Sequence, residues 1–330
     1  MVSGLNWDLT QAETATGSVD LRHQVGVTVR QPVVICHPEP NDDPARWRQV
    51  AAAVQALPVV LVAADARPDA PHDWADLITD HPHTVLDAIA QHPHAATVTA
   101  QVLRHRPTSP AGGRLLESLA YATLQAGEEH RRWLANRGLR TRNDQEPRVR
   151  LTDNGDHLRL TLVRRRLHNM MDHRMRDELR EALLTINHDR ERRPVIWDAE
   201  GPSFCAGGDL AEFGTVPSAE IAHGIRSSAE LAPLIDPIAD RLTVVIDGAC
   251  VGAGIELAAV SGTISAGPLA RFRLPELSLG LLPGAGGTWS IPARIGRQRT
   301  LEWLVFDREL DADTAYRWGL IDRQHDPSTT

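Results

Sequence analysis

Two glycine-rich turns and two glutamates are the residues of this sequence best suited to chemistry. The first turn lies within Cys205–Asp209, and the second is Gly252-Ala253-Gly254. Glycine lets the backbone approach a ligand closely, and an N–H group at the start of a helix carries the positive end of the helix dipole. Two such N–H groups can stabilise a developing oxyanion. Glu256 and Glu276 follow the second turn, and two carboxyl groups beside a water molecule can share its proton transfers.

Strand-like segments must position both turns. Pro194–Trp197 precedes the first turn and Thr243–Ile246 precedes the second, which predicts a βα unit that occurs twice. Glu256–Val260 is typical of the first turn of a buried helix, where a carboxylate is unexpected unless it is paired or functional. Glu276 directly follows Pro275, so we expect irregular backbone there. A single Gly-x-Gly run is usually only a turn, and a single acid near a helix start is usually a surface residue. The order and spacing of all these parts together favour a catalytic site.

A known family shares this arrangement. From about Arg148 to Asp322 the sequence resembles the enoyl-CoA hydratase/isomerase (crotonase) superfamily, and the most specific stretch is Phe272–Thr288. The resemblance implies an α/β fold with a crotonase-like (ClpP/crotonase) core of repeated ββα turns. It also implies an acyl-CoA substrate, fatty acid metabolism, no cofactor beyond the coenzyme A of the substrate, and a homo-oligomer, either a trimer or a hexamer.

The resemblance assigns roles to individual residues. Gly208 and Ala253 fall where the two oxyanion-hole N–H groups of the family lie, although Ala253 replaces the more usual glycine. Glu256 and Glu276 match the two glutamates of the hydratases. Asn169 matches the early asparagine of the loop that lines the CoA site, although the usual proline of that loop is missing. The other residues expected to bind the substrate or CoA are Cys205, Ala206, Gly207, Asp209, Leu210, Gly252, Pro283 and Gly284.

The two acids favour hydration, because family members with other activities commonly replace one or both of them. Adding water to an α,β-unsaturated thioester puts negative charge on the thioester oxygen, which two preorganised N–H donors stabilise. We expect Glu276 to be the acid or base nearer Cα and Glu256 to position and activate the water. The alternatives are an enoyl-CoA isomerase, an acyl-CoA thioester hydrolase, a cofactor-independent acyl-CoA oxygenase and a catalytically weak partner subunit that binds CoA esters.

Composition excludes several other classes of protein. The 330 residues are 42% hydrophobic and carry a net charge of −8, which argues against a surface that binds nucleic acid or anionic membranes. No apolar run reaches about 18 residues, and no signal region opens the sequence. Cys36, Cys205 and Cys250 lack the spacing of metal ligands, so we expect reduced thiols in a cytoplasmic protein without a metal site.

The amino-terminal region is expected to be separate, with residues 1–145 preceding a catalytic core at 146–330. Its order of elements loosely mimics part of the core but lacks the glycine-rich turns, so a degenerate crotonase-like half and an unrelated mixed α/β or helical region are both open. The expected elements are a polar arm to Gln31, strands at 32–36 and 59–63, helices at 44–57, 74–78 and 84–90, one or two amphipathic helices at 114–137, and a linker at 138–147.

The helices at 114–137 have a further expected role. The resemblance implies helices after Asp322 that cap the acyl pocket, but the sequence ends at Thr330. We therefore expect the amino-terminal helices to close this pocket, because their apolar side chains would otherwise lack a partner. The side chains expected to point inward are Leu116, Leu119, Leu124 and Trp133.

Overall fold

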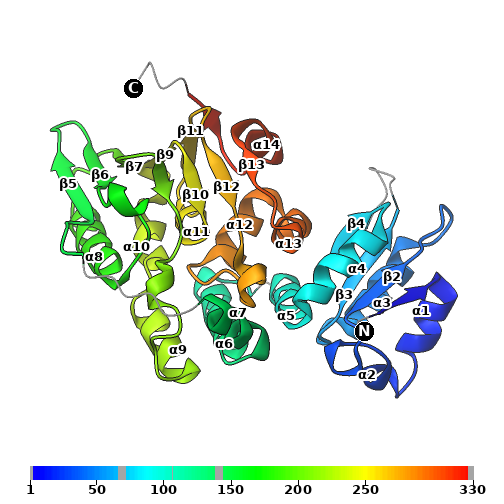
Figure 1. Ribbon diagram of the computed structural model, residues 1–330. Coiled ribbons are helices and arrows are strands. Elements are labelled where there is room, and N and C mark those ends of the chain that lie inside the picture. The colour runs from blue at the N-terminus through cyan, green and yellow to red at the C-terminus, as the bar shows by residue number, and fades with distance from the viewer. Residues whose placement is uncertain (1–2, 66–71, 106, 138–143, 326–330) are drawn as a thin grey trace.

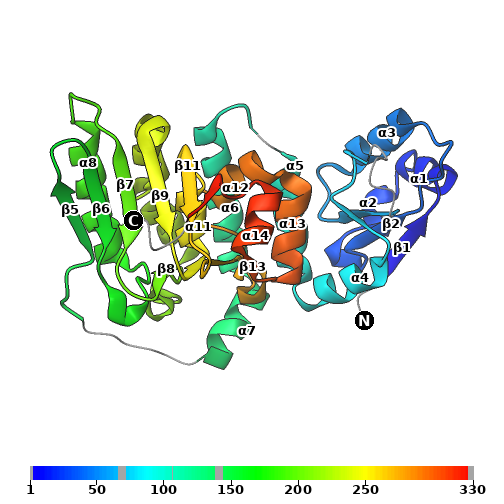
Figure 2. The same cartoon turned by 90° about the horizontal axis from the view of Figure 1, so that it is seen from above.

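The computed structural model describes residues 3–65, 72–105, 107–137 and 144–325. It contains an amino-terminal sheet unit, a set of bridging helices and a core with two sheets. In Figure 1 and in Figure 2 the helix α5 lies between the amino-terminal sheet and the core, and Figure 1 shows α6 below the sheets of the core, beside α7 and α9.

The amino-terminal unit is a parallel sheet of four strands in the order β1-β2-β3-β4. The strands are β1 (Gly4–Trp7), β2 (Val33–Cys36), β3 (Val60–Ala64) and β4 (Leu77–Thr79), and the helices are α1 (Leu9–Thr16), α2 (Leu21–Gln24), α3 (Pro44–Val54) and α4 (Pro82–Gln91). All residues of β2 are buried, as is usual for a parallel strand covered on both faces. Trp47 of α3 stacks on Trp74 with ring centroids 4.8 Å apart.

Two of the expectations for this unit are wrong. The polar arm to Gln31 contains β1, α1 and α2, because Asp8 and Gln11 form a capping box that starts α1 and Trp7 and Leu9 are buried. The helix expected at 74–78 is replaced by β4, because Leu77 pairs with Val62 of β3. Pairing with a distant strand has overridden the local pattern there.

The core alternates between its two sheets. The larger sheet has the order β14-β11-β9-β7-β6-β5 and the smaller has the order β13-β12-β10-β8. The strands of the larger sheet are β5 (Val149–Asp153), β6 (Leu158–Leu162), β7 (Val195–Ala199), β9 (Leu242–Ile246), β11 (Thr263–Ala266) and β14 (Arg323–Gln324). Those of the smaller sheet are β8 (Ser203–Cys205), β10 (Ala249–Val251), β12 (Arg271–Arg273) and β13 (Leu310–Asp311). The chain passes from β7 to β8, from β9 to β10 and from β11 to β12, which confirms the expected α/β fold of repeated ββα turns.

Helices surround these sheets and connect the two regions. The bridging helices are α5 (Pro93–Arg104), α6 (Pro110–Gln125) and α7 (Glu128–Arg137), and those of the core are α8 (His173–Asn187), α9 (Ala219–Ser228), α10 (Ala232–Ile235), α11 (Ala253–Ala258), α12 (Gly287–Ile295), α13 (Arg297–Phe306) and α14 (Ala312–Trp318). Helix α6 packs against α5, α9 and α12. Arg297 of α13 forms an ion pair with Asp76 of the amino-terminal unit at 3.1 Å, so the two regions are joined by polar contacts as well as by packing.

Candidate active site

A cavity of about 960 Å³ lies where the bridging helices meet the core. Tyr121 and Gln125 of α6 line it, together with Arg226 of α9. It also brings together most of the site residues expected from the sequence, which are Ala206, Gly207, Gly208, Asp209, Leu210, Gly252, Ala253, Glu256, Glu276 and Gly284.

The two glycine-rich turns leave neighbouring strands. Cys205 of β8 pairs with Cys250 of β10 in parallel, so both turns start at the same edge of the smaller sheet. Gly207 has φ 87° and Gly252 has φ 49°, values that L side chains rarely adopt. A Cβ atom on Gly207 would also lie 3.2 Å from the carbonyl oxygen of Val251, so the two turns approach each other closely.

These turns leave two N–H groups available. Met171 holds the first turn on both sides of Gly208, since its N–H donates to Gly207 O (2.8 Å) and its carbonyl accepts from Asp209 N (2.9 Å). Ala253 is the first residue of α11, where a backbone N–H has no intrahelical partner. Within the part of the chain that the structure describes, neither Gly208 N nor Ala253 N donates a hydrogen bond. Both residues line the cavity.

Glu256 is buried in α11 and held by backbone donors. Its side chain is 2% exposed, and Oε2 accepts hydrogen bonds from Ala285 N (2.6 Å) and Gly287 N (3.0 Å). A Cβ atom on Gly287 would lie 2.5 Å from Cγ of Glu256, so only glycine permits this approach. Burial and then the neighbouring Glu276 raise the pKa of Glu256 to about 8, although the backbone donors act in the opposite direction.

Glu276 is buried without comparable support. It begins the short 3₁₀ helix η5 (Glu276–Leu279), in agreement with the irregular backbone expected after Pro275. Its Oε2 has no hydrogen-bond partner among the described residues. Burial raises the pKa of Glu276 to about 8, and negative charge on Asp307 and Glu117 acts in the same direction. A carboxyl group that is buried and poorly solvated favours its protonated form, while the donors around Glu256 favour an ionised carboxylate. The pKa of each acid is raised to about 8, so the two differ in their hydrogen bonds, which make Glu256 the better candidate for the base and Glu276 for the acid.

Three of the expected binding residues do not line the cavity. They are Asn169, Cys205 and Pro283. Asn169 is fully buried and its Nδ2 donates to Glu200 O (2.9 Å) and Ser203 O (2.8 Å), so it ties the turn before β8 together. Burial raises the pKa of the Cys205 thiol to about 12, which makes it a poor nucleophile.

A network of buried charges forms one wall of the cavity. Arg164 contacts Asp144 (2.9 Å), Asp172 (3.1 Å) and Asp209 (2.9 Å), and Arg148 contacts Asp172 at 2.9 Å. Asp209, expected to bind the substrate, is thus engaged with an arginine. No group of three histidine, cysteine or acidic side chains suited to a metal ion occurs among the residues that the structure describes.

Helix α6 supplies a carboxylate that the sequence analysis missed. Glu117 is 2% exposed, and burial together with the nearby Glu256 raises its pKa to about 8. It is the only acid in the otherwise apolar or neutral run between Arg114 and Glu128. The argument that singled out Glu256, that a carboxylate in a buried helix must be paired or functional, would also have found Glu117.

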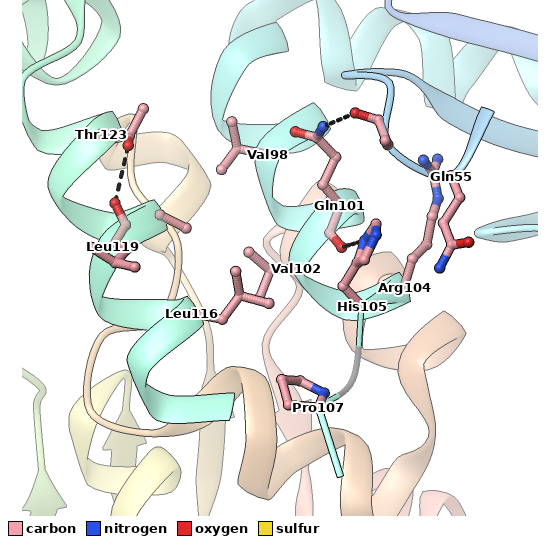
Figure 3. Close-up of a pocket in the computed structure, with 12 residues that line it drawn as sticks. Gln55, Val98, Gln101, Val102, Arg104, His105, Pro107, Leu116, Leu119 and Thr123 are labelled. Carbon is pink, nitrogen blue, oxygen red and sulfur yellow. Dashed lines mark hydrogen bonds between the residues drawn. The ribbon is translucent and has the colours of Figure 1, made fainter. Parts of the chain in front are cut away.

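The orientation of α6 corrects one expectation. Leu124 is buried and Leu116 is partly buried, but Leu119 is 49% exposed and does not point toward the active site. Figure 3 shows Leu116 and Leu119 beside a second groove, of about 720 Å³, between α5 and α6. The face of α6 that meets the core is formed by Gly113, Glu117 and Tyr121, which follow one another at the i, i+4 spacing of a helix face. Gly113 permits the close approach, because a Cβ atom there would lie 2.5 Å from the Trp289 ring.

Helix α7 contacts two segments of the site, although none of its residues lines the cavity. Nδ1 of His130 lies 2.8 Å from the carbonyl oxygen of Leu279, next to the segment that begins with Glu276. The Trp133 ring is partly buried and meets the Phe213 ring edge-on, with centroids 5.8 Å apart. Phe213 in turn lies against Gly208. Helices α6 and α7 therefore contact the segments that carry Glu256, Glu276 and Gly208. The linker expected at 138–147 falls largely on residues 138–143, which lie outside the described ranges.

The core is similar to known enoyl-CoA hydratases and isomerases. The family model described as enoyl-CoA hydratase/isomerase matches residues 155–327. The enoyl-CoA isomerase/hydratase fer4 of Mycosarcoma maydis is 36% identical over 138 residues, which are 42% of this chain and 50% of that protein. The protein named probable enoyl-CoA hydratase 2, mitochondrial, of Arabidopsis thaliana is 32% identical over 154 residues, or 46% of this chain and 51% of that protein. The chain thus spans about half the length of these curated relatives. The crystal structure of enoyl-CoA hydratase from Bacillus anthracis has a TM-score of 0.50 and 26% identity, and the match covers 54% of this chain and 70% of that one.

Proposed function

The chain belongs to the enoyl-CoA hydratase/isomerase family, and we propose that it is an enoyl-CoA hydratase, which adds water across the double bond of a 2-enoyl-CoA thioester. The observation that carries this proposal is the pair Glu256 and Glu276, both buried and both at the wall of one cavity. An isomerase needs only a single acid or base for its proton shift, so the second buried carboxyl group favours hydration. One relative named above is called an enoyl-CoA isomerase/hydratase and the other a probable enoyl-CoA hydratase. These names leave both activities open for this chain, and hydration is our proposal.

The proposed mechanism begins with the thioester oxygen between Gly208 N and Ala253 N. These donors stabilise the negative charge that develops there, and one such donor is typically worth about 3 kcal/mol. Glu256, as a carboxylate, takes a proton from the attacking water while the water oxygen forms a bond to Cβ. The protonated Glu276 gives its proton to Cα, so the double bond is saturated and the thioester is unchanged. A proton passes from Glu256 to Glu276 to restore the starting state.

The amino-terminal helices complete the pocket in this proposal. Tyr121 packs against Gly284, where a Cβ atom would lie 2.5 Å from its ring, and the Arg226 guanidinium lies over the same ring with Cζ 3.9 Å from the centroid. Leu279 and Leu281 line the same cavity and add apolar surface. We propose that α6 and α7 close the acyl pocket and that Tyr121 forms part of its wall. Arg176 lines the cavity and pairs with Glu212 at 3.2 Å, and we propose that it exchanges this partner for a phosphate of CoA.

Other expectations remain predictions. A trimer or hexamer, a cytoplasmic location and the absence of a cofactor beyond the CoA of the substrate were inferred from the sequence. One relative has a mitochondrial name. Among the described residues no helix has both the length and the apolar character that crossing a bilayer requires.

The proposal is tested with a panel of short, long and aromatic 2-enoyl-CoA substrates. Hydration removes the conjugated double bond, so the absorbance of the enoyl thioester should fall without release of free CoA thiol. A 3-enoyl-CoA distinguishes the isomerase, because moving its double bond would create this absorbance. Turnover of the 3-enoyl-CoA with no loss of absorbance from any 2-enoyl-CoA would overturn the hydratase proposal, and thiol release would point to a hydrolase.

A further inference from the structure

The start of α12 is held by two carboxylates, one from each region of the molecule. Four successive backbone N–H groups, those of residues 285–288, donate alternately to Glu256 and to Glu117. The donors to Glu256 are Ala285 (2.6 Å) and Gly287 (3.0 Å), and the donors to Glu117 are Gly286 (2.7 Å) and Thr288 (2.8 Å). The hydroxyl group of Thr288 also donates to Glu117, at 2.7 Å.

This arrangement couples the two acids mechanically. The first N–H groups of a helix have no intrahelical acceptor, so buried ones need a side chain or a ligand. Glu117 accepts hydrogen bonds from two of the four N–H groups, those of Gly286 and Thr288. The segment held in this way directs the N–H groups of Ala285 and Gly287 at Glu256. Gly286 has φ 99°, a conformation that glycine adopts without strain, and it joins the two sets of contacts. Without Glu117 the segment would lose its anchor, and Ala285 N and Gly287 N could no longer be held in place for Glu256.

We infer that Glu117 is a positioning residue of the active site, which acts by fixing the 285–288 segment that orients the Glu256 carboxylate. Glu117 lies outside the stretch that matches the family model, which begins at residue 155. The amino-terminal region would thus supply a part of the catalytic machinery in the same chain. The role of Glu117 in catalysis rests on the proposed hydratase function, whereas the coupling of Glu117 to Glu256 does not depend on that function.

Charge provides a second link between the two acids. The negative charge of Glu256 raises the pKa of Glu117. Because the coupling between two titrating groups is reciprocal, we expect an ionised Glu117 to raise the pKa of Glu256 as well. The other charged or titratable groups that act on this cluster are Glu276 of η5, Arg226 of α9 and Tyr121 of α6. Replacing Glu117 with a neutral residue removes one negative charge, so the pKa of Glu256 should fall.

The experiment compares Glu117→Gln with a matched control. Glu129 of α7 accepts from His94 N (2.9 Å) and Ala95 N (3.0 Å) at the start of α5, so it makes the same kind of contact but does not line the active-site cavity. We expect Glu117→Gln to reduce kcat about 10-fold or more while KM changes little, because a small displacement of a catalytic group reduces the rate more than the affinity. The acidic limb of the kcat/KM profile should move to lower pH. Glu129→Gln should show neither change.

A second substitution separates position from charge. Glu117→Asp keeps the negative charge but shortens the side chain, so kcat should fall and the acidic limb should move to higher pH, because displaced backbone donors no longer lower the pKa of Glu256. An unchanged kcat in both Glu117→Gln and Glu117→Asp, measured on folded full-length protein, would overturn the inference. An equal loss in Glu129→Gln would also overturn it, since the effect would then be a general consequence of losing a buried helix cap.

A measurement without turnover keeps the inference independent of the proposed function. Carboxyl carbons of labelled glutamate can be titrated by NMR, and the signal of Glu256 is identified by its loss in Glu256→Gln. We expect this signal to titrate at lower pH in Glu117→Gln than in the unmodified protein. If no enoyl-CoA is turned over but the shift occurs, the function fails and the coupling stands. Loss of the charge lowers the pKa of Glu256, whereas loss of the positioned backbone donors raises it. A Glu256 titration that is unshifted in both Glu117→Gln and Glu117→Asp therefore contradicts the coupling whatever the activity.

Discussion

The amino-terminal unit and the core both place a helix after a parallel strand, but they satisfy the start of that helix differently. After β2 the chain reaches α3, where the carboxylate of Asp43 accepts from Ala45 N at 2.9 Å and caps the helix. After β10 the chain turns at Gly252 and enters α11 without a side-chain cap, so the N–H of Ala253 stays available. In these two βα units, a capping side chain occupies the helix start of α3, whereas the glycine before α11 leaves a backbone N–H that could serve the proposed oxyanion site.

The buried acids give the largest expected difference between the two regions. Glu256→Gln and Glu276→Gln should each reduce kcat by roughly 10²-fold or more, because each removes a group that transfers a proton, while ligand affinity changes much less. Asp43→Asn, the matched change in the amino-terminal unit, should leave kcat unaltered and change the free energy of unfolding by about 1 kcal/mol at most. Full activity in either glutamine variant would remove the two-carboxylate mechanism.

The free N–H groups of the core provide the next test. Gly208→Pro deletes one donor and should raise the free energy of the transition state by about 3 kcal/mol, with some further loss from distortion of the turn. Ala253→Gly keeps the N–H group and should be nearly silent. Steady-state kinetics on both variants measure the difference. If folded Ala253→Gly instead lost most of its activity, the methyl group of Ala253 would have a role in catalysis beyond that of the N–H group.

Tyr121 tests whether the amino-terminal helices shape the pocket of the core. Tyr121→Ala removes the ring that packs against Gly284, so the pocket should enlarge toward α6. We expect the ratio of kcat/KM for long over short 2-enoyl-CoA substrates to rise about 10-fold, a typical size for discrimination by apolar contacts. Leu119→Ala is the control, because this side chain on the same helix is half exposed. An unchanged ratio in Tyr121→Ala would show that α6 is not part of the acyl wall.

The smallest expected effect concerns stability. The pKa values of Glu117, Glu256 and Glu276 are raised to about 8 in the folded protein, so these groups bind protons that the unfolded chain has released. Their contribution is present at low pH and is lost as the pH rises through about 8, by up to about 1.4 kcal/mol per pH unit for each proton. Tm should therefore fall by a few degrees between about pH 7 and 8. The fall in Tm should be smaller in Glu117→Gln. Thermal melts between about pH 7 and 8 measure Tm in both proteins, and a Tm that rises with pH would contradict this prediction.

The sequence allowed the core to be predicted because its requirements are local. Gly207 and Gly252 adopt backbone angles that favour glycine, and Glu256 stands in an apolar helix, so each residue type is dictated within a few positions. Glu117 could have been singled out as a lone acid in an apolar helix, but its role could not have been predicted, because its partners Gly286 and Thr288 lie 169 and 171 residues away. The sequence of a helix does not show which distant turn of the chain the helix will pack against.

The orientation of α6 was also beyond the sequence, for a related reason. The prediction assumed that Leu116, Leu119 and Leu124 face inward, but α6 meets α12 through the small Gly113, and Leu119 lies on an exposed face. Similarly, β4 exists because β3 provides a partner, and three residues contain too little pattern to distinguish a strand from a helix. Long-range contacts decided the features that local patterns could not.

Addition of water to the double bond can be followed through the atoms of the water itself. The protein is incubated with a 2-enoyl-CoA in water labelled with heavy oxygen and deuterium, and the product is analysed by mass spectrometry and NMR. The proposed hydration places one solvent oxygen at Cβ and one solvent hydrogen at Cα and leaves the thioester intact. A product that gains hydrogen but no oxygen, or one that carries the solvent oxygen in a free carboxylate, would contradict it.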